Sequence, residues 1–162
     1  MIPAEFDEIR PYLPEELPQV FEELIADPEF QTAMGYAFKG MPFENIAAAM
    51  RASKSNLEFQ KALVYPFLQG VLGKLSSGLT VSYDNKENMA KSLCISNHRD
   101  IIMDSAFLCI VFVNTVGNTV EIAIGDNLLI RPWIKKLVRV NRSFIGQRSA
   151  PIREMLASSK RL

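Results

Sequence analysis

The only histidine of the chain, His98, is followed closely by two aspartates. His98 comes directly after an apolar segment that predicts a buried strand, and Asp100 is a good N-cap for a following helix. Asp104 then lies one helical turn further along, on the same face near the helix N-terminus. Either carboxylate could accept the proton of one imidazole nitrogen and leave the other nitrogen as a general base. On spacing alone a second interpretation stays open, in which Asp100 caps the helix, Asp104 is solvated and His98 fills a turn.

The elements around this cluster alternate between strands and helices. We expect strands over 79–83, 92–96, 119–124 and 143–146, and helices over 100–113, 128–138 and 150–159. Such alternation is typical of βαβ units, and His98 would stand at the carboxyl end of a strand, where such sheets bind ligands. The predicted fold class is therefore α/β, a mostly parallel sheet with crossover helices preceded by a helical N-terminal region. The chain divides into that helical region, residues 1–76, and an α/β domain, residues 77–162.

The N-terminal region is predicted to hold three helices. One opens at Pro14, a second spans about 42–53, and a third covers 56–75 with a kink at Pro66. The third helix carries apolar side chains at three- and four-residue spacing. Such a stripe fits packing onto a core or, alternatively, contact with a lipid surface.

Composition excludes several classes of function. The 162 residues carry 18 basic and 18 acidic side chains, so bulk positive charge does not drive binding to nucleic acid. No glycine pattern of a nucleotide-binding loop is present. One histidine and two separated cysteines give no typical metal site, so we expect none.

The cysteines and the N-terminus indicate a compartment. Cys94 and Cys109 lie in apolar runs without a CxxC spacing, and we expect both to be buried thiols in a reducing environment. The N-terminus is acidic and lacks a secretory signal, and the longest apolar run, 101–113, is too short to span a bilayer. We expect a cytoplasmic protein, and peripheral contact with the inner membrane surface stays open.

Charge is unevenly distributed along the chain. Residues 1–30 hold nine acidic side chains and one basic one, whereas residues 121–162 hold nine basic and three acidic ones. The basic side chains nearest the predicted helix 128–138 are Arg131, Lys135, Lys136, Arg139 and Arg142. They could face an anionic membrane or a phosphorylated carrier, or simply form a solvated helix face.

The segment from Ser96 to Asp104 resembles the first block of the glycerolipid acyltransferases, which acylate glycerol-3-phosphate or 1-acylglycerol-3-phosphate. The signature of that block is Asn-His, four residues and then Asp. Here Met103 stands where the family has its carboxylate, and Asp104 arrives one residue late.

Further segments extend the resemblance over about residues 78–148, in the family's order and at its separations. Those leading into the histidine are 79–81, 86–88 and 93–96, and those between the first two blocks are 122–129 and 132–133. Residues 144–148 resemble the second block, three apolar residues, a polar one and Arg, with departures at Gly146 and Gln147.

The resemblance implies a role for each residue of the cluster. His98 would take the proton of an acceptor hydroxyl as that hydroxyl attacks an acyl thioester. Asp104, or failing that Asp100, would orient the imidazole and stabilise its charged form, as in a Ser-His-Asp array. The substrate hydroxyl replaces the serine, so no acyl-enzyme is needed.

The resemblance also implies how the substrates are held. Arg148 would bind the acceptor phosphate through its planar, permanently charged guanidinium, and Arg99 and Arg142 are candidate secondary anion contacts. The donor would be acyl-CoA or acyl carrier protein, and no cofactor is required.

The third block of the family, a Glu-Gly-Thr-Arg-like segment, has no counterpart in the sequence. The simplest interpretation is an N-terminal portion of a longer protein with an incomplete sheet and site. The predicted strand 143–146 would then present an open edge that favours self-association. The alternative function is a non-catalytic lipid- or phosphate-binding module on the same scaffold.

Overall fold

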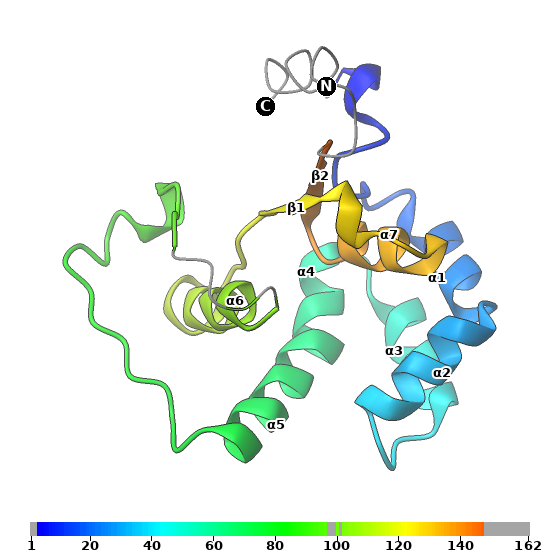
Figure 1. Ribbon diagram of the computed structural model, residues 1–162, viewed down its shortest axis with the longest axis horizontal. Helices are drawn as coiled ribbons and strands as arrows, with labels where there is room; N and C mark the ends of the chain where they lie inside the picture. Colours follow the sequence, from blue (N-terminus) through cyan, green and yellow to red (C-terminus); the bar gives the residue numbers. More distant parts are fainter. Residues whose placement is uncertain (1–2, 97–99, 101, 148–162) are drawn as a thin grey trace.

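The computed structural model describes residues 3–96, 100 and 102–147. Within these residues helices dominate and the sheet is small (Figure 1). The helices are α1 (Leu17–Ile25), α2 (Pro28–Ala37), α3 (Phe43–Ala52), α4 (Asn56–Phe59), α5 (Tyr65–Leu75), α6 (Met103–Val116) and α7 (Pro132–Val140). Short helical segments are η1 (Ala4–Phe6), the π-helical η2 (Gln60–Val64), η3 (Met89–Lys91) and η4 (Asp126–Leu128), and the strands are β1 (Ile122–Gly125) and β2 (Ser143–Gly146).

The helical N-terminal region predicted from the sequence is confirmed. Helix α3 matches the expected helix 42–53 closely, while the expected helix 56–75 is divided into α4, the π-helical η2 and α5. The division has a local cause, because Pro66 has no N–H to donate to the preceding turn. The N–H of Tyr65 instead bonds to the carbonyl of Gln60, five residues back, which is the π-helical spacing.

Helix α2 begins at a side-chain cap. The Asp27 carboxylate accepts the N–H groups of Glu29 at 2.8 Å and Phe30 at 3.1 Å, and Pro28 occupies the first helical position. We expect Asp27→Ala to lower the free energy of unfolding by about 1 kcal/mol, because two N–H groups lose their acceptor. Urea denaturation checks this, with Asp27→Ser as the control that keeps a capping oxygen; an equal loss in both variants would contradict it.

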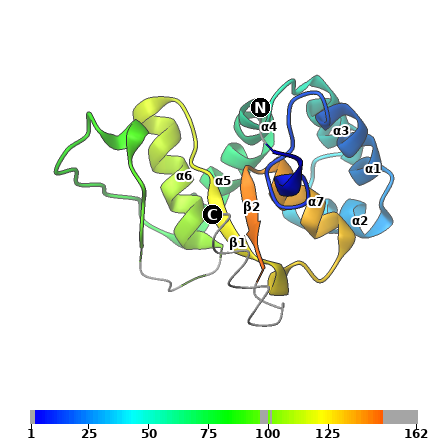
Figure 2. The same cartoon turned by 90° about the horizontal axis from the view of Figure 1, so that it is seen from above.

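The main core joins α1, α2 and α3 to a helix from much later in the chain. Leu17, Phe21 and Leu24 of α1 are nearly or fully buried, and so is Val140 at the end of α7. Trp133 of α7 packs against the same cluster. Both views accordingly place α7 beside α1, with α5 between this group and α6 (Figures 1 and 2).

The sheet is one parallel βαβ unit. Strands β1 and β2 pair in register from Ile122 opposite Ser143 to Gly125 opposite Gly146, with α7 as the crossover. The expected strand 143–146 is confirmed, and the expected strand 119–124 is shorter and shifted toward 125. Helix α7 begins later than expected because Pro132 takes its first position, where a missing N–H costs nothing.

The expected strands 79–83 and 92–96 are wrong for this structure. Both segments are irregular, and Leu93 and Ile95 are 88% and 89% exposed. Among the described residues only β1 and β2 pair as strands, so neither segment belongs to a sheet. Cys94 is consequently exposed, contrary to expectation, whereas Cys109 is buried as expected.

Two expectations remain, a C-terminal helix and the absence of a membrane-spanning helix. The expected helix 150–159 lies outside the described residues. Within the ranges given above, no helix combines the length and the apolar character needed to cross a membrane.

Candidate functional site

The start of α6 is organised by the two predicted aspartates. One carboxylate oxygen of Asp100 accepts the N–H groups of Ile102 at 2.9 Å and Met103 at 2.8 Å. The Asp104 carboxylate accepts the N–H of Asp100 itself at 2.9 Å. Each acid thus satisfies N–H groups that precede or begin the helix, where negative charge is favoured by the helix dipole. Asp100 thus binds the N–H of the first helical residue, but α6 begins at Met103 with Ile102 as its N-cap, so the expected N-cap at Asp100 is wrong.

The other predicted site residues, His98, Arg99 and Arg148, lie outside the described residues. The structure therefore brings Asp100 and Asp104 together at one end of α6 and describes no contact of the imidazole or of these two guanidinium groups. Within the described part of the chain, no group of three or more metal-ligating side chains is assembled.

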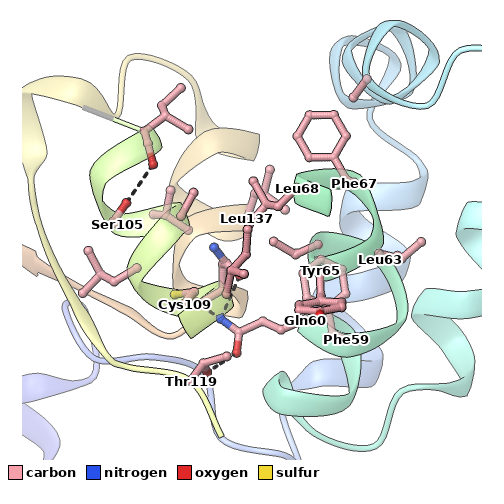
Figure 3. A pocket seen from close by; sticks show the side chains of 18 of the residues that line it. Phe59, Gln60, Leu63, Tyr65, Phe67, Leu68, Ser105, Cys109, Thr119 and Leu137 are labelled. Atoms are coloured by element: carbon pink, nitrogen blue, oxygen red, sulfur yellow. Dashed lines mark hydrogen bonds between the residues drawn. The ribbon is translucent and has the colours of Figure 1, made fainter. Parts of the chain in front are cut away.

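An apolar cavity of about 320 Å³ lies beside α6 (Figure 3). Its walls come from η2 and α5 on one side and α6 on the other, and α2, α3 and α7 contribute further side chains. Most lining side chains are aliphatic or aromatic, among them Phe59, Leu63, Phe67, Leu68, Ala106 and Ile110. A cavity of this kind binds a chain-like apolar ligand with little desolvation cost, because neither surface loses hydrogen bonds.

One end of this cavity reaches the first turn of α6. Ile102 and Ser105 belong to its lining, and the Ser105 hydroxyl donates to the Ile102 carbonyl at 3.1 Å. Ile102 and Ser105 flank Asp104 in the sequence, and Ile102 binds the Asp100 carboxylate through its N–H. The cavity therefore reaches the N-terminal turn of α6, which carries Asp104 and follows Asp100 in the chain.

A buried polar cluster also lines the cavity. Gln60, 3% exposed on the π-helical turn, donates to the side-chain oxygen of Asn141 at 2.9 Å and accepts the Thr119 hydroxyl at 2.5 Å (Figure 3). Thr119 is itself 7% exposed and accepts from Arg142 at 3.0 Å. Every described buried side-chain polar atom has a partner, so this cluster is fully satisfied. It ties the N-terminal helices to the segments on either side of α7.

Sequence reasoning missed Gln60 and Thr119. The available signal was a polar residue inside the apolar pattern of 56–75, six positions before the helix-disrupting Pro66. Cys109, which does lie on the cavity wall, was predicted to be buried; that burial raises the pKa of its thiol.

The guanidinium of Arg142, a candidate anion contact, is bound by other groups of the chain. Its guanidinium donates to Asn118 at 2.6 Å and to the Thr119 carbonyl at 3.1 Å, and it pairs with Glu121 at 3.5 Å. The residue adopts φ of 59°, an uncommon left-handed conformation for a side chain of this size. It thus ties the connection between α6 and β1 to the turn that precedes β2.

The outer edge of β2 is not fully open. The N–H of Ile145 donates to the carbonyl of Ile9 at 2.9 Å, so the N-terminal segment covers the strand at this position. The expectation of an exposed edge over 143–146 is therefore corrected at Ile145, because an unpaired strand N–H has found a partner within the chain.

Comparison with known proteins found no match. No protein-family model matches the chain, and neither a curated protein nor a solved structure does.

Proposed function

We propose that the chain forms the acyl-binding part of a glycerolipid acyltransferase, which transfers a fatty acyl group from acyl-CoA or acyl carrier protein to glycerol-3-phosphate or 1-acylglycerol-3-phosphate in phospholipid synthesis. The observation that supports this most is the junction of the apolar cavity with the first turn of α6. An acyl chain in the cavity would bring its thioester end toward Asp100 and Asp104. The sequence resemblance around His98 implies that this residue is the general base.

The proposed chemistry is a direct transfer with His98 as general base. The acceptor oxygen forms a bond to the thioester carbonyl carbon while His98 takes the hydroxyl proton. The carbon–sulfur bond then breaks, and the imidazolium returns this proton to the departing thiolate. Asp104, or failing that Asp100, orients the imidazole and stabilises its charged form.

The acceptor is proposed to be held by arginine. Arg148 binds the phosphate through a bidentate pair, and Arg99 adds a second positive charge next to His98. Because Arg142 is engaged by Asn118 and Thr119, it has no part in this proposal.

The direct test is thiol release from palmitoyl-CoA, measured with and without glycerol-3-phosphate or 1-acylglycerol-3-phosphate. We expect release that depends on one of these acceptors and yields the acylated product. Absence of release with both acceptors, from a chain whose circular dichroism shows the fold intact, would contradict catalysis.

A cavity-filling substitution tests the acyl site separately. Ala106, 7% exposed, lines the cavity from α6, so Ala106→Phe places a ring where the chain would lie. Excluding only two methylene groups costs about 1.6 kcal/mol, so we expect palmitate affinity to fall more than tenfold in calorimetry. Ala48→Phe, on the exposed side of α3, is the matched control. Unchanged affinity in Ala106→Phe would remove the cavity as the acyl site.

A non-catalytic lipid- or phosphate-binding module is the second candidate. The observation that favours it is the irregular conformation of 92–96, the segment that would have to position His98. Palmitate binding that Ala106→Phe weakens, together with no acceptor-dependent thiol release, would select this function.

A further inference from the structure

Residues 3–12 lie across helix α7 (Figure 2). Arg139 of α7, 6% exposed, donates to the carbonyls of Arg10 at 2.7 Å and Asp7 at 2.5 Å. Its guanidinium also stacks 3.9 Å from the centre of the Tyr12 ring. The backbone of the N-terminal segment is thus held on one face of α7.

The basic side chains of α7 and its N-cap that keep exposed surface are Arg131, Lys135 and Lys136, and we call these three the basic face. Arg139, four residues after Lys135, is covered by the N-terminal segment and is not part of this face. Trp133 and Leu137 pack against the core on the other side. A helix with one basic and one apolar face is typical of elements that lie on membrane surfaces.

Acidic side chains of the N-terminal part pair with the exposed basic groups. We call Glu8, Glu23 and Glu29 the acidic cover. Glu8 pairs with Lys135 at 3.1 Å, Glu23 with Lys136 at 2.8 Å and Glu29 with Arg131 at 3.4 Å. The Lys135 and Lys136 contacts hold the pKa values of the Glu8 and Glu23 carboxyls below their usual range.

We propose that the basic face of α7 is a binding surface for the headgroups of anionic phospholipids, and that the acidic cover competes with those headgroups for it. The proposal goes beyond the proposed function, because it requires neither His98 nor the cavity. Its basis is charge complementarity: the groups that an anionic leaflet would attract are those that the cover already neutralises.

The pairs of the cover can be exchanged for lipid because they are weak. The Glu8 side chain is 85% exposed and that of Lys135 41%, so water and salt screen their attraction. The attraction of a basic side chain to an anionic leaflet is of similar size. Ile130, 79% exposed and next to Arg131, adds an apolar side chain that can enter the interface.

The test is sedimentation with vesicles of phosphatidylcholine containing phosphatidylglycerol, and with vesicles of phosphatidylcholine alone. Glu8→Gln, Glu23→Gln and Glu29→Gln, combined in one variant, remove the charge of the cover and keep hydrogen-bonding groups. We expect its partition onto anionic vesicles to exceed that of the native chain by about tenfold or more, and to decline with added salt. The single variant Glu8→Gln, at a highly exposed position, should show a smaller rise without risk to folding.

The matched control is the triple variant Glu44→Gln, Asp84→Asn and Glu87→Gln, which changes the net charge equally at exposed positions outside the cover. An equal rise in the control would overturn the proposal, because net charge alone would then explain binding. So would no rise in either the cover triple or Glu8→Gln, or an equal rise on phosphatidylcholine alone. Adding Lys135→Gln and Lys136→Gln to the cover triple should remove the gain, and a gain that persists would place the lipid surface elsewhere.

Discussion

Replacement of His98 by alanine is expected to abolish acceptor-dependent thiol release while the chain stays folded. A positioned general base contributes roughly a hundred- to ten-thousand-fold to such a rate, and the chain holds no second histidine to replace it. The free energy of unfolding should change by less than about 1 kcal/mol, the usual effect of a substitution away from the core. Thiol release and urea denaturation, measured on the same preparation, check both parts.

A control variant and substitutions of the two neighbouring aspartates test whether the loss of rate is specific to the proposed site. Lys91→Ala, at an exposed position before the site, should leave the rate unchanged. Asp104→Asn should cause a large loss, and Asp100→Asn a smaller one because an amide oxygen can still cap α6. Parallel loss of fold and rate in His98→Ala would argue against a catalytic role.

The second large effect is expected for Gln60→Leu, which should lower the free energy of unfolding by about 3 kcal/mol. Leucine has a similar volume but cannot hydrogen-bond. The Thr119 hydroxyl loses its acceptor and the Asn141 oxygen loses its donor, both near the cavity, and each group left unsatisfied costs about 1–3 kcal/mol. Urea denaturation measures the change.

A double-mutant cycle with Thr119→Val separates this effect from a change in packing. If the two side chains act through their 2.5 Å hydrogen bond, the double variant should lose less stability than the sum of the single ones, by about 1 kcal/mol. Gln69→Leu, on the partly exposed side of α5, is the control and should change stability by less than about 0.5 kcal/mol. Additive losses would assign the effect of Gln60 to packing alone.

Most helices and the short parallel unit were predictable because their signals are local, whereas α2, over 28–37, was not predicted. The apolar spacing and flanking prolines of 43–52 and 132–140 act within a few residues of each helix. Strand 143–146 was placed at its observed bounds. A disruption of the helix at Pro66 was also predicted; the structure shows a π-helical turn there, in which the Tyr65 N–H bonds to the Gln60 carbonyl.

The errors concern features that depend on distant partners. The alternating pattern of 79–83 describes how a strand would present its side chains, yet a strand exists only when another strand accepts its hydrogen bonds. The pairing of Glu8 with Lys135 joins residues 127 positions apart, so the separate acidic and basic stretches gave no indication of contact.

The candidate site was predictable only in part, for the same reason. The place of Asp100 just before α6 follows from local sequence, although the helix begins later than expected and Ile102 is its N-cap. The apolar cavity and its polar cluster bring Gln60, Thr119 and Asn141 together from three segments, a placement that no spacing in the sequence encodes. The parts of the proposed reaction that depend on His98 and Arg148 remain predictions.

The contribution of α7 to the main core has a consequence for synthesis of the chain. Val140 completes a cluster formed mainly by α1 to α4, and the Asn56 side chain donates to its carbonyl across 84 residues. At translation rates of about 5–20 residues per second, several seconds pass between the emergence of α4 and that of α7. During this interval Phe21 and Leu24 lack part of their covering, so the nascent N-terminal helices present an apolar surface to chaperones and to other nascent chains.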